Sequence, residues 1–290
     1  HGYDIAVLTW NDEGPRSVFG VEEIHEPVRP ISDEVEADEG DEEVILESEE
    51  EDLETVDETD TSPETAPEES TEVTASLRNG LLRIRGTSDD DIIILRQKQG
   101  KLSIDDVMIM VGEETHSSVN ISNVNRIEIR GLSGDDDIRL NSGIIHAQEE
   151  ITVPIKVWAG TGDDRVWGSA GDNIIYGEGG HDVIYGSGGN DLLSGGEGDD
   201  NNWGGTGMDE VKGGKSNDTL KGGEQDDLIH GGEGENQLVG NDGADAIFSI
   251  SSYDVIYGNH GYDTATLSYM ASKLGEDQIF GVEEIIEPEG

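Results

Sequence analysis

Residues 159–266 read AGTGDDRVW, GSAGDNIIY, GEGGHDVIY, GSGGNDLLS, GGEGDDNNW, GGTGMDEVK, GGKSNDTLK, GGEQDDLIH, GGEGENQLV, GNDGADAIF, SISSYDVIY and GNHGYDTAT. These are twelve consecutive copies of one nine-residue phrase, G-G-x-G-x-D-x-U-x, in which U is a large aliphatic residue. No insertion or deletion separates the copies. A fixed period of this kind predicts a repeat architecture in which similar small units stack on one another.

The eighth position of the phrase is a large aliphatic residue in ten of the twelve copies, and the exceptions are Asn202 and Ala265. A flexible Gly-rich linker is the alternative interpretation, but a linker has no reason to place aliphatic side chains at multiples of nine. A solenoid needs one inward side chain from each short strand, and the three residues after each turn suffice for a minimal strand. The period therefore favours an all-β solenoid.

The sixth position carries an acidic residue or its amide in every copy: Asp164, Asn173, Asp182, Asp191, Asp200, Asp209, Asp218, Asp227, Asn236, Asp245, Asp254 and Asp263. We expect the glycines at positions 1, 2 and 4 to take positive φ, so that the backbone turns tightly and aims carbonyl oxygens inward. Several hard oxygen ligands in a pliable loop suit Ca²⁺ better than zinc or copper, and the chain has no Cys. The phrase thus predicts multiple calcium sites.

The repeat tract resembles the RTX repeats of secreted bacterial proteins, and it covers 108 of the 290 residues. The resemblance implies a right-handed parallel β-roll with two phrases per coil, in which the turns of successive coils stack and share ions. One edge would present Asp164, Asp182, Asp200, Asp218, Asn236 and Asp254, and the other Asn173, Asp191, Asp209, Asp227, Asp245 and Asp263. The copy at 249–257 has lost every glycine and matches the motif least.

The composition suits a solenoid better than a conventional globular core, since only 32% of the residues are hydrophobic. The formal net charge is −50, so self-repulsion opposes compaction unless cations neutralise it. Such an acidic chain is not expected to bind nucleic acid, and no apolar run is long enough to insert into a membrane. The absence of Cys fits an exported bacterial protein held by ions, at the cell surface or outside the cell.

The two ends of the chain are related in sequence. Residues 1–30 contain HGYD, FGVEEI and EP in the same order as the C-terminal segment 267–290 and the end of the last repeat, with two residues fewer between the anchors. We interpret 1–30 as the end of a preceding module in an array of similar modules, and 267–290 as a C-terminal cap. The alternative is a local duplication whose front copy docks on this chain's own roll.

Residues 31–73 form an acidic linker. Residues 31–72 hold 21 Asp and Glu among 42 residues and no Lys or Arg, a composition typical of solvated linkers. Some apolar content around Val44 to Leu46 leaves open that the linker is ordered along a neighbouring subunit. An EF-hand in EADEGDEEVILE is disfavoured because Gly40 stands where a ligand belongs.

Residues 74–158 are predicted to be rich in β-strands, with alternating stretches such as LLRIRG, DIIILRQ and NRIEIRG. Two phrases in this region fit the nonapeptide frame and place Asp91 and Asp136 at its sixth position. We therefore expect a wider β-solenoid that continues into the roll of 159–266 and adds Asp91 and Asp136 to the metal ligands. A separate β-sandwich joined near Trp158 is the alternative.

Positions 7 and 9 of the phrase should point outward because position 8 points inward. On one face this stacks Trp167, Tyr185 and Trp203, and on the other it exposes Ile174, Leu192, Leu228 and Phe248. Large apolar surface patches often mark interaction sites, so we expect part of this surface to be an interface. The alternative is that outward aromatic residues simply favour strands.

The sequence carries no HExxH, GxSxG or Cys nucleophile, so we do not expect an enzyme. The leading hypothesis is a calcium-stiffened structural module of a bacterial surface or fibre protein that associates with itself end to end, as a homo-oligomer or polymer. One alternative is an adhesin that binds a carbohydrate or another surface. The other is the secretion or carrier tail of a secreted enzyme.

Overall fold

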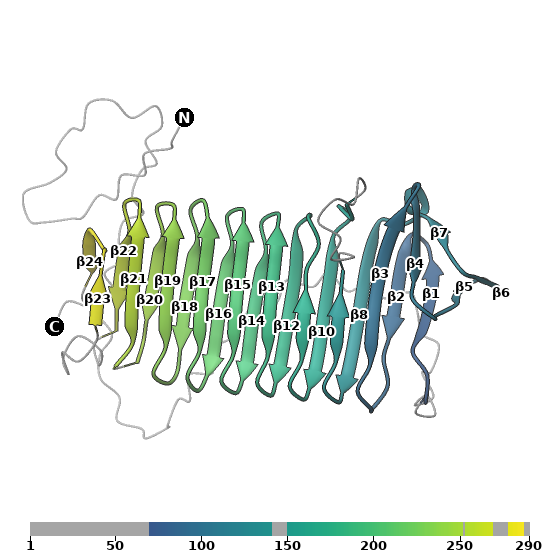
Figure 1. Cartoon of the computed structure of the whole chain (residues 1–290), viewed down its shortest axis with the longest axis horizontal. Helices are drawn as coiled ribbons and strands as arrows, with labels where there is room; N and C mark the ends of the chain where they lie inside the picture. Colours follow the sequence, from purple (N-terminus) through teal and green to yellow (C-terminus); the bar gives the residue numbers. More distant parts are fainter. Residues whose placement is uncertain (1–69, 141–149, 252, 269–277, 287–290) are drawn as a thin grey trace, which may run out of the picture. The chain divides into compact units, whose positions relative to one another are not determined.

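The computed structural model describes residues 70–140, 150–251, 253–268 and 278–286. These residues form a stack of β-strands in two long sheets, and they include no α-helix, only the 3-10 turn Ile121–Asn123 (Figure 1). The predicted all-β solenoid is confirmed. Residues 1–69, which hold the duplicated N-terminal segment and most of the acidic linker, lie outside the described residues.

The first sheet has 13 strands in the order β24-β22-β20-β18-β16-β14-β12-β10-β8-β2-β1-β5-β6. Their bounds are β1 Thr74–Arg78, β2 Leu81–Arg85, β5 Ile109–Val111, β6 Glu114–His116, β8 Arg126–Ser133, β10 Ile155–Thr161, β12 Asn173–Gly179, β14 Leu192–Glu197, β16 Glu210–Lys215, β18 Leu228–Gly232, β20 Ala246–Ser249, β22 Thr264–Leu267 and β24 Glu284–Ile286.

The second sheet has 11 strands in the order β23-β21-β19-β17-β15-β13-β11-β9-β3-β4-β7. Their bounds are β3 Ile92–Lys98, β4 Lys101–Ile104, β7 Val119–Asn120, β9 Asp137–Arg139, β11 Arg165–Trp167, β13 Val183–Gly188, β15 Asn201–Thr206, β17 Thr219–Glu224, β19 Gln237–Asp242, β21 Val255–His260 and β23 Gln278–Phe280.

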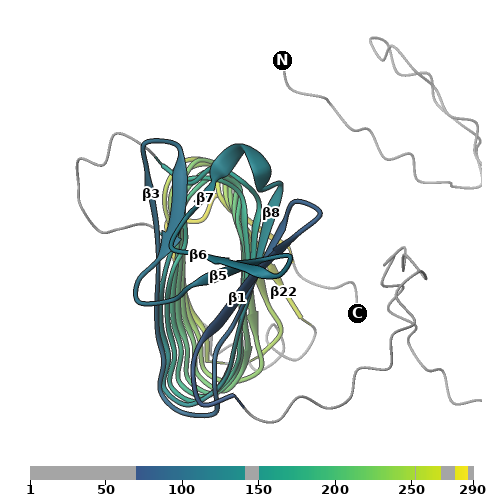
Figure 2. The same cartoon turned by 90° about the vertical axis from the view of Figure 1, so that its right-hand side faces the viewer.

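Successive strands of the repeat tract alternate between the two sheets, so each coil contributes one strand to each sheet. Ile175 pairs in parallel with Leu193, and Ile184 pairs with Asn202, so neighbouring coils are offset by two phrases. Viewed along the stack, the coils superpose and enclose a narrow core (Figure 2). This arrangement is the two-phrase coil that the resemblance implied.

The core of the repeat tract is the column of eighth-position side chains, which are fully buried from Val166 to Ala265. Asn202 lies in this column, fully buried between Ile184 and Leu220 of the paired strands. Its Nδ2 donates to the backbone oxygen of Lys212 at 3.0 Å, which satisfies one end of the amide, while its Oδ1 has no hydrogen-bond partner. The strands are longer than the expected three residues because they continue through the first glycines of the next phrase.

Residues 74–140 belong to the same two sheets as the repeats. Strand β8 pairs in parallel with β10, and β9 pairs in parallel with β11, so the pairing does not stop at Trp158 and a separate sandwich is excluded. The hydrogen bonds that join equivalent turns span 45 residues from Asp91 to Asp136, 28 from Asp136 to Asp164 and 18 thereafter. The number of residues per coil therefore decreases toward the repeats.

The two ends of the stack are built differently. At the N-terminal end, antiparallel hairpins (β1 with β2, β3 with β4, and β5 with β6) and the antiparallel pair β4 with β7 end both sheets (Figure 1). At the C-terminal end, β23 and β24 add one further, incomplete coil. Only Gly281, Val282 and Glu283 separate these strands, and the Asp263 N–H donates to Glu283 Oε2 at 2.8 Å. The longer Glu side chain thus replaces the sixth-position Asp in a shorter turn.

Candidate metal centres

The sixth-position side chains form two rows along the stack, one at each edge where the chain turns between the sheets. All fourteen are buried, with at most 9% of their surface exposed. The first row holds Asp91, Asp136, Asp164, Asp182, Asp200, Asp218, Asn236 and Asp254, and the second row holds Asn173, Asp191, Asp209, Asp227, Asp245 and Asp263. Each row brings together residues predicted as metal ligands.

A backbone ladder fixes one oxygen of each side chain after the first in each row. The N–H of Asp182 donates to Oδ1 of Asp200 in the next coil at 2.8 Å, and the N–H of Asp200 donates to Oδ1 of Asp218 at 2.9 Å. The same bond recurs along both rows at 2.7 to 3.0 Å. The side chains that accept this bond therefore share one orientation, with Oδ2, or Nδ2 in Asn236, turned away from the ladder.

Ten of these carboxylates bury Oδ2 without any hydrogen-bond partner: Asp136, Asp164, Asp182, Asp191, Asp200, Asp209, Asp218, Asp227, Asp245 and Asp263. A buried charged oxygen without a partner is strongly unfavourable, because it has lost water and gained nothing in exchange. Ten repetitions of the same unfavourable feature indicate a missing positive partner at each. A bound cation would supply that partner.

The first-position glycine leaves the space for that cation. A Cβ added to Gly177 would lie 2.1 Å from Asp182 Oδ2 and 2.6 Å from the backbone oxygen of Gly195. A Cβ on Gly213 would lie 2.2 Å from Asp218 Oδ2 and 2.4 Å from the oxygen of Gly231. A carboxylate oxygen and a carbonyl oxygen of the next coil thus converge on one side-chain-free space, and such hard oxygen donors suit Ca²⁺.

The expectation that glycines at positions 1, 2 and 4 all take positive φ is wrong for position 1. Positive φ occurs at position 2, as at Gly196 (121°), and at position 4, as at Gly198 (120°), but at none of the first-position glycines. Position 1 needs glycine for space, whereas positions 2 and 4 need it for backbone conformation. Where position 4 is Ser216 or Gln225, the residue still takes a φ of 78° or 81°, a strained conformation for a side chain-bearing residue.

Burial changes the acidity of these carboxyl groups. Desolvation, with a smaller contribution from the neighbouring carboxylates of the row, raises the pKa of Asp182 and Asp200 from the ordinary 3.8 to about 7, although the backbone N–H bond opposes the shift. The same cause raises the pKa of Asp227 to about 8 and that of Asp245 to about 6. At neutral pH the charged rows are therefore unfavourable unless cations balance them.

Four sixth-position side chains have partners for their second polar atom. Thr87 N–H donates to Asp91 Oδ2 at 2.6 Å, and the Ser249 hydroxyl donates to Asp254 Oδ2 at 2.6 Å. Asn173 and Asn236 place an amide nitrogen there instead of an oxygen. The structure thus brings all the predicted residues into the rows but divides them into two kinds.

A second ladder, which the sequence pattern did not predict, runs along position 5, outside the first. Asp163 N–H donates to Asp135 Oδ1 at 2.9 Å, and His181 N–H donates to Asp163 Oδ1 at 2.8 Å. These side chains are exposed, and the ladder continues through Asp199 and Asn217. The signal for it in the sequence is the frequency of Asp, Asn and His at the fifth position.

The comparison with known families agrees with this geometry. The family model of the RTX calcium-binding nonapeptide repeat matches four times, at residues 158–193, 167–201, 203–238 and 226–249. This part of the chain is therefore an RTX repeat tract, and RTX repeats bind multiple Ca²⁺ ions. RTX proteins are typically secreted by bacteria, and the repeat is structural and calcium-binding rather than catalytic. No curated protein matches the chain.

Calcium in these turns would depend mainly on backbone ligands. Within residues 70–140, 150–251, 253–268 and 278–286, no three His, Asp or Glu side chains gather into a metal site. Each cation would therefore combine a sixth-position Oδ2 with carbonyl oxygens of the turns. No helix among the described residues is long and apolar enough to cross a membrane.

The outward aromatic residues form a ladder along the second sheet. Trp167 and Tyr185 stack with ring centroids 5.9 Å apart, and Tyr185 lies 6.0 Å from Trp203. The guanidinium of Arg139 lies over Trp167, and the ammonium of Lys221 lies over Trp203. The rings therefore pack on one another and on cations, as residues that favour strands would, and an interface role for them stays a prediction.

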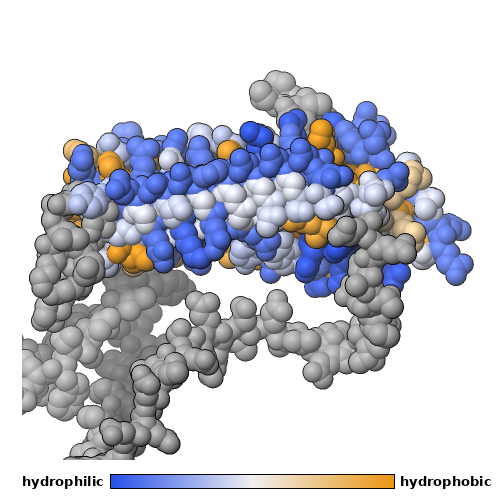
Figure 3. Space-filling model, turned by 90° about the horizontal axis from the view of Figure 1, so that it is seen from below, coloured by the Kyte–Doolittle hydropathy of each residue, from blue (hydrophilic) through white to orange (hydrophobic). Residues whose placement is uncertain are grey.

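The aliphatic face on the first sheet is less exposed than expected. Ile174, at 36%, is the most accessible of the four, whereas Leu192, Leu228 and Phe248 are partly buried. Phe248 stacks on His230 with centroids 4.9 Å apart, so neighbouring coils cover part of each side chain. Figure 3 views the stack from below and shows rows of hydrophilic and near-neutral residues along it, with hydrophobic patches toward its ends.

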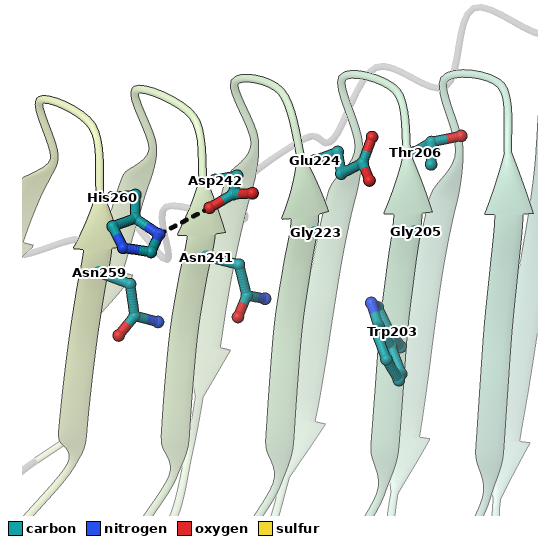
Figure 4. A pocket seen from close by; sticks show the side chains of 9 residues that line it. All are labelled: Trp203, Gly205, Thr206, Gly223, Glu224, Asn241, Asp242, Asn259 and His260. Atoms are coloured by element: carbon teal, nitrogen blue, oxygen red, sulfur yellow. Dashed lines mark hydrogen bonds and ion pairs between the residues drawn. The ribbon is translucent and has the colours of Figure 1, made fainter.

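A groove of about 620 Å³ runs beside Trp203 across four strands of the second sheet (Figure 4). Gly205 and Gly223 leave its floor without side chains. Its polar lining residues are Thr206, Glu224, Asn241, Asp242, Asn259 and His260, and His260 Nδ1 lies 2.8 Å from Asp242 Oδ1. The groove thus combines an exposed aromatic ring with carboxylate, amide and hydroxyl groups.

A first prediction concerns the space above the first-position glycine. Gly213→Ala places a methyl group 2.2 Å from Asp218 Oδ2, so we expect one fewer bound calcium and a calcium-loaded stability lower by about 1–3 kcal/mol, as for an overpacked core. Gly179→Ala is the control, because an added Cβ there meets nothing within 4 Å. Urea unfolding of both variants in calcium checks this. Equal stability of the Gly213→Ala and Gly179→Ala variants would contradict a cation site in the space at the first-position glycine.

A second prediction concerns pH. Because the folded-state pKa of the buried Asp residues is raised from 3.8 to about 7, protonation favours the folded, calcium-free roll. This stabilisation is complete below about pH 4 and is lost as pH rises through about 7. We expect the β-sheet circular dichroism of calcium-stripped protein to increase from pH 8 to pH 5. A signal that stays constant or decreases on acidification would show that the carboxylates are not buried in the folded state.

Proposed function

We propose that the chain is a calcium-dependent structural module of an exported bacterial surface or extracellular fibre protein. It folds and stiffens on binding Ca²⁺ and associates with itself end to end. The observation that carries the calcium part is the set of ten buried Oδ2 atoms without partners. The RTX match supports the same metal and an exported protein.

The mechanism is folding coupled to metal binding. With a formal net charge of −50, the chain repels itself, and the rows concentrate that repulsion in buried turns. Calcium concentrations inside cells are too low to offset this, so the repeats stay unfolded and suited to export. Outside the cell, calcium neutralises both rows and joins each coil to the next, which makes the stack rigid.

The C-terminal end of the stack supports end-to-end association. Ile285 pairs with Ala265 of the buried column but is 48% exposed, since no further coil among the described residues covers it, and Ile286 and Phe280 are 45% and 48% exposed. Strands β24 and β23 are also the last in their sheets, and such edges favour pairing with another chain. The repetition of FGVEEI at residues 19–24 fits an array of similar modules.

Calcium titration with two readouts tests this function. We expect calcium to produce β-sheet circular dichroism cooperatively, and sedimentation velocity to show larger assemblies only in calcium. Ile285→Lys should keep the calcium-induced β-sheet signal but reduce assembly at least tenfold, because it charges the exposed end. Loss of calcium-dependent folding contradicts the whole proposal, whereas calcium-dependent folding without assembly contradicts only the association.

A second candidate function, binding of a carbohydrate, is favoured by the groove beside Trp203. Sugars commonly lie on an exposed aromatic face and hydrogen-bond to neighbouring carboxylates and amides, and this groove offers both. We expect calcium-loaded protein to bind members of a glycan array, and Trp203→Ala to weaken that binding at least tenfold. Tyr262→Ala is the control, since Tyr262 is 60% exposed and does not line the groove. Binding that both variants retain would place the sugar elsewhere.

A further inference from the structure

The four sixth-position residues with partners share a feature that the other ten lack: a protein donor bonds to their second oxygen, or an amide nitrogen replaces that oxygen. We propose that these four turns, at Asp91, Asn173, Asn236 and Asp254, are built to stay without calcium. Calcium is then confined to two runs of five turns. This inference rests on the proposed calcium function and specifies which turns carry it out.

Asn173 shows the replacement most clearly. Its Nδ2 donates to the backbone oxygen of Gly171 at 2.6 Å, to that of Gly186 at 3.3 Å and to Asp191 Oδ1 at 2.8 Å. Gly186 is the first-position glycine of the next coil. Elsewhere in the stack, as at Gly177 and Gly195, the backbone oxygen of this glycine faces the same space as an unpartnered Oδ2. A Cβ on Gly168 would lie 2.1 Å from Gly186 O and 3.1 Å from Asn173 Nδ2. The amide N–H groups therefore satisfy the oxygens that a cation would otherwise bind.

Asn236 repeats this arrangement in the first row. Its Oδ1 accepts the ladder bond from Asp218 at 2.9 Å, which turns Nδ2 toward the first-position space, 3.1 Å from a Cβ added to Gly231. Nδ2 reaches the oxygen of Gly232 at 3.5 Å. A donor pointing into this space repels a cation instead of binding it.

Asp254 keeps its carboxylate but has lost the space. Ser249 replaces the first-position glycine, is 1% exposed, and donates its hydroxyl to Asp254 Oδ2 at 2.6 Å. Asp91 keeps the space at Gly86, where an added Cβ would lie 2.6 Å from its Oδ2, but both of its oxygens have donors. Thr87 donates its N–H to Oδ2 at 2.6 Å and its hydroxyl to Oδ1 at 3.2 Å. In both turns the buried oxygen has a protein donor.

The four metal-free turns lie beside two uninterrupted runs of turns with unpartnered oxygens. The first row keeps unpartnered oxygens at Asp136, Asp164, Asp182, Asp200 and Asp218, with metal-free turns on both sides. The second keeps them at Asp191, Asp209, Asp227, Asp245 and Asp263, after the metal-free turn at Asn173. The C-terminal segment completes the last of these, since a Cβ on Gly258 would lie 2.1 Å from Gly281 O and 2.4 Å from Asp263 Oδ2. The metal-free turns thus lie at the ends of the calcium runs. Their internal hydrogen bonds do not depend on calcium and remain when calcium leaves.

Counting bound calcium by native mass spectrometry of the full chain tests this inference. Asn173→Asp and Ser249→Gly should each bind one calcium more than the parent protein, because each removes a protein donor and leaves a free oxygen. Asp209→Asn is the matched control and should bind one fewer. Circular dichroism in calcium establishes that each variant is folded, and either of the first two decides the question if the other fails to fold.

The outcomes separate this inference from the proposed function. A parent protein that binds no calcium contradicts the proposed function itself. A parent protein that binds calcium, together with folded Asn173→Asp and Ser249→Gly variants that bind the same number as the parent, overturns the inference alone. A gain of one ion in a folded variant supports it.

Discussion

The structure depends on the stacking of like charges. The sheet hydrogen bonds place equivalent residues of neighbouring coils about 4.8 Å apart, and this spacing cannot be relaxed without breaking the sheets. Carboxylates at that spacing in a buried turn repel one another more strongly than in water, since the local dielectric is low. The backbone N–H ladder offsets part of this repulsion at Oδ1, and Oδ2 is left for a cation. Under the proposed function, folding of the repeats is therefore coupled to the binding of metal.

The glycine pattern follows from the same constraint. Position 1 lacks a side chain so that Oδ2 of the sixth residue and a carbonyl oxygen of the next coil can face one space. Positions 2 and 4 lack one so that the backbone can turn there. The aliphatic column alone is narrow, and it is interrupted by the buried amide of Asn202. The ladder bonds in the two rows of turns add contacts between neighbouring coils.

The repeat period made much of the fold predictable from the sequence. It identified the buried eighth-position column, and the resemblance to RTX repeats implied the two phrases per coil that place alternate strands in two sheets. Asp91 and Asp136 indicated that the solenoid begins before the repeats. The period also selected the sixth-position residues, and the structure gathers them in two rows. What it could not show is the partner of each second oxygen, because that depends on residues such as Thr87 and Ser249 in the same turn.

Other features depend on contacts that no local pattern records. The three-residue turn at Gly281 to Glu283 works because a Glu side chain reaches the Asp263 N–H, and sequence alone gives no sign of that reach. The number of residues in each of the first coils depends on hairpins, such as β3 with β4, that extend from the sheets. The sequence pattern suggested that the outward aromatic residues form an uncovered surface. In the structure these rings stack on one another and on Arg139 and Lys221, which cover part of that surface.

Hydrogen–deuterium exchange of the full chain, with and without calcium, tests the central claim most directly. If calcium in the turns holds the coils together, amides of the ladder from Asp136 to Asp263 should be protected in calcium and exchange at least a hundredfold faster after its removal at neutral pH. Equal protection of these amides in both conditions would contradict the account, because it would mean that the buried carboxylates stack without a cation.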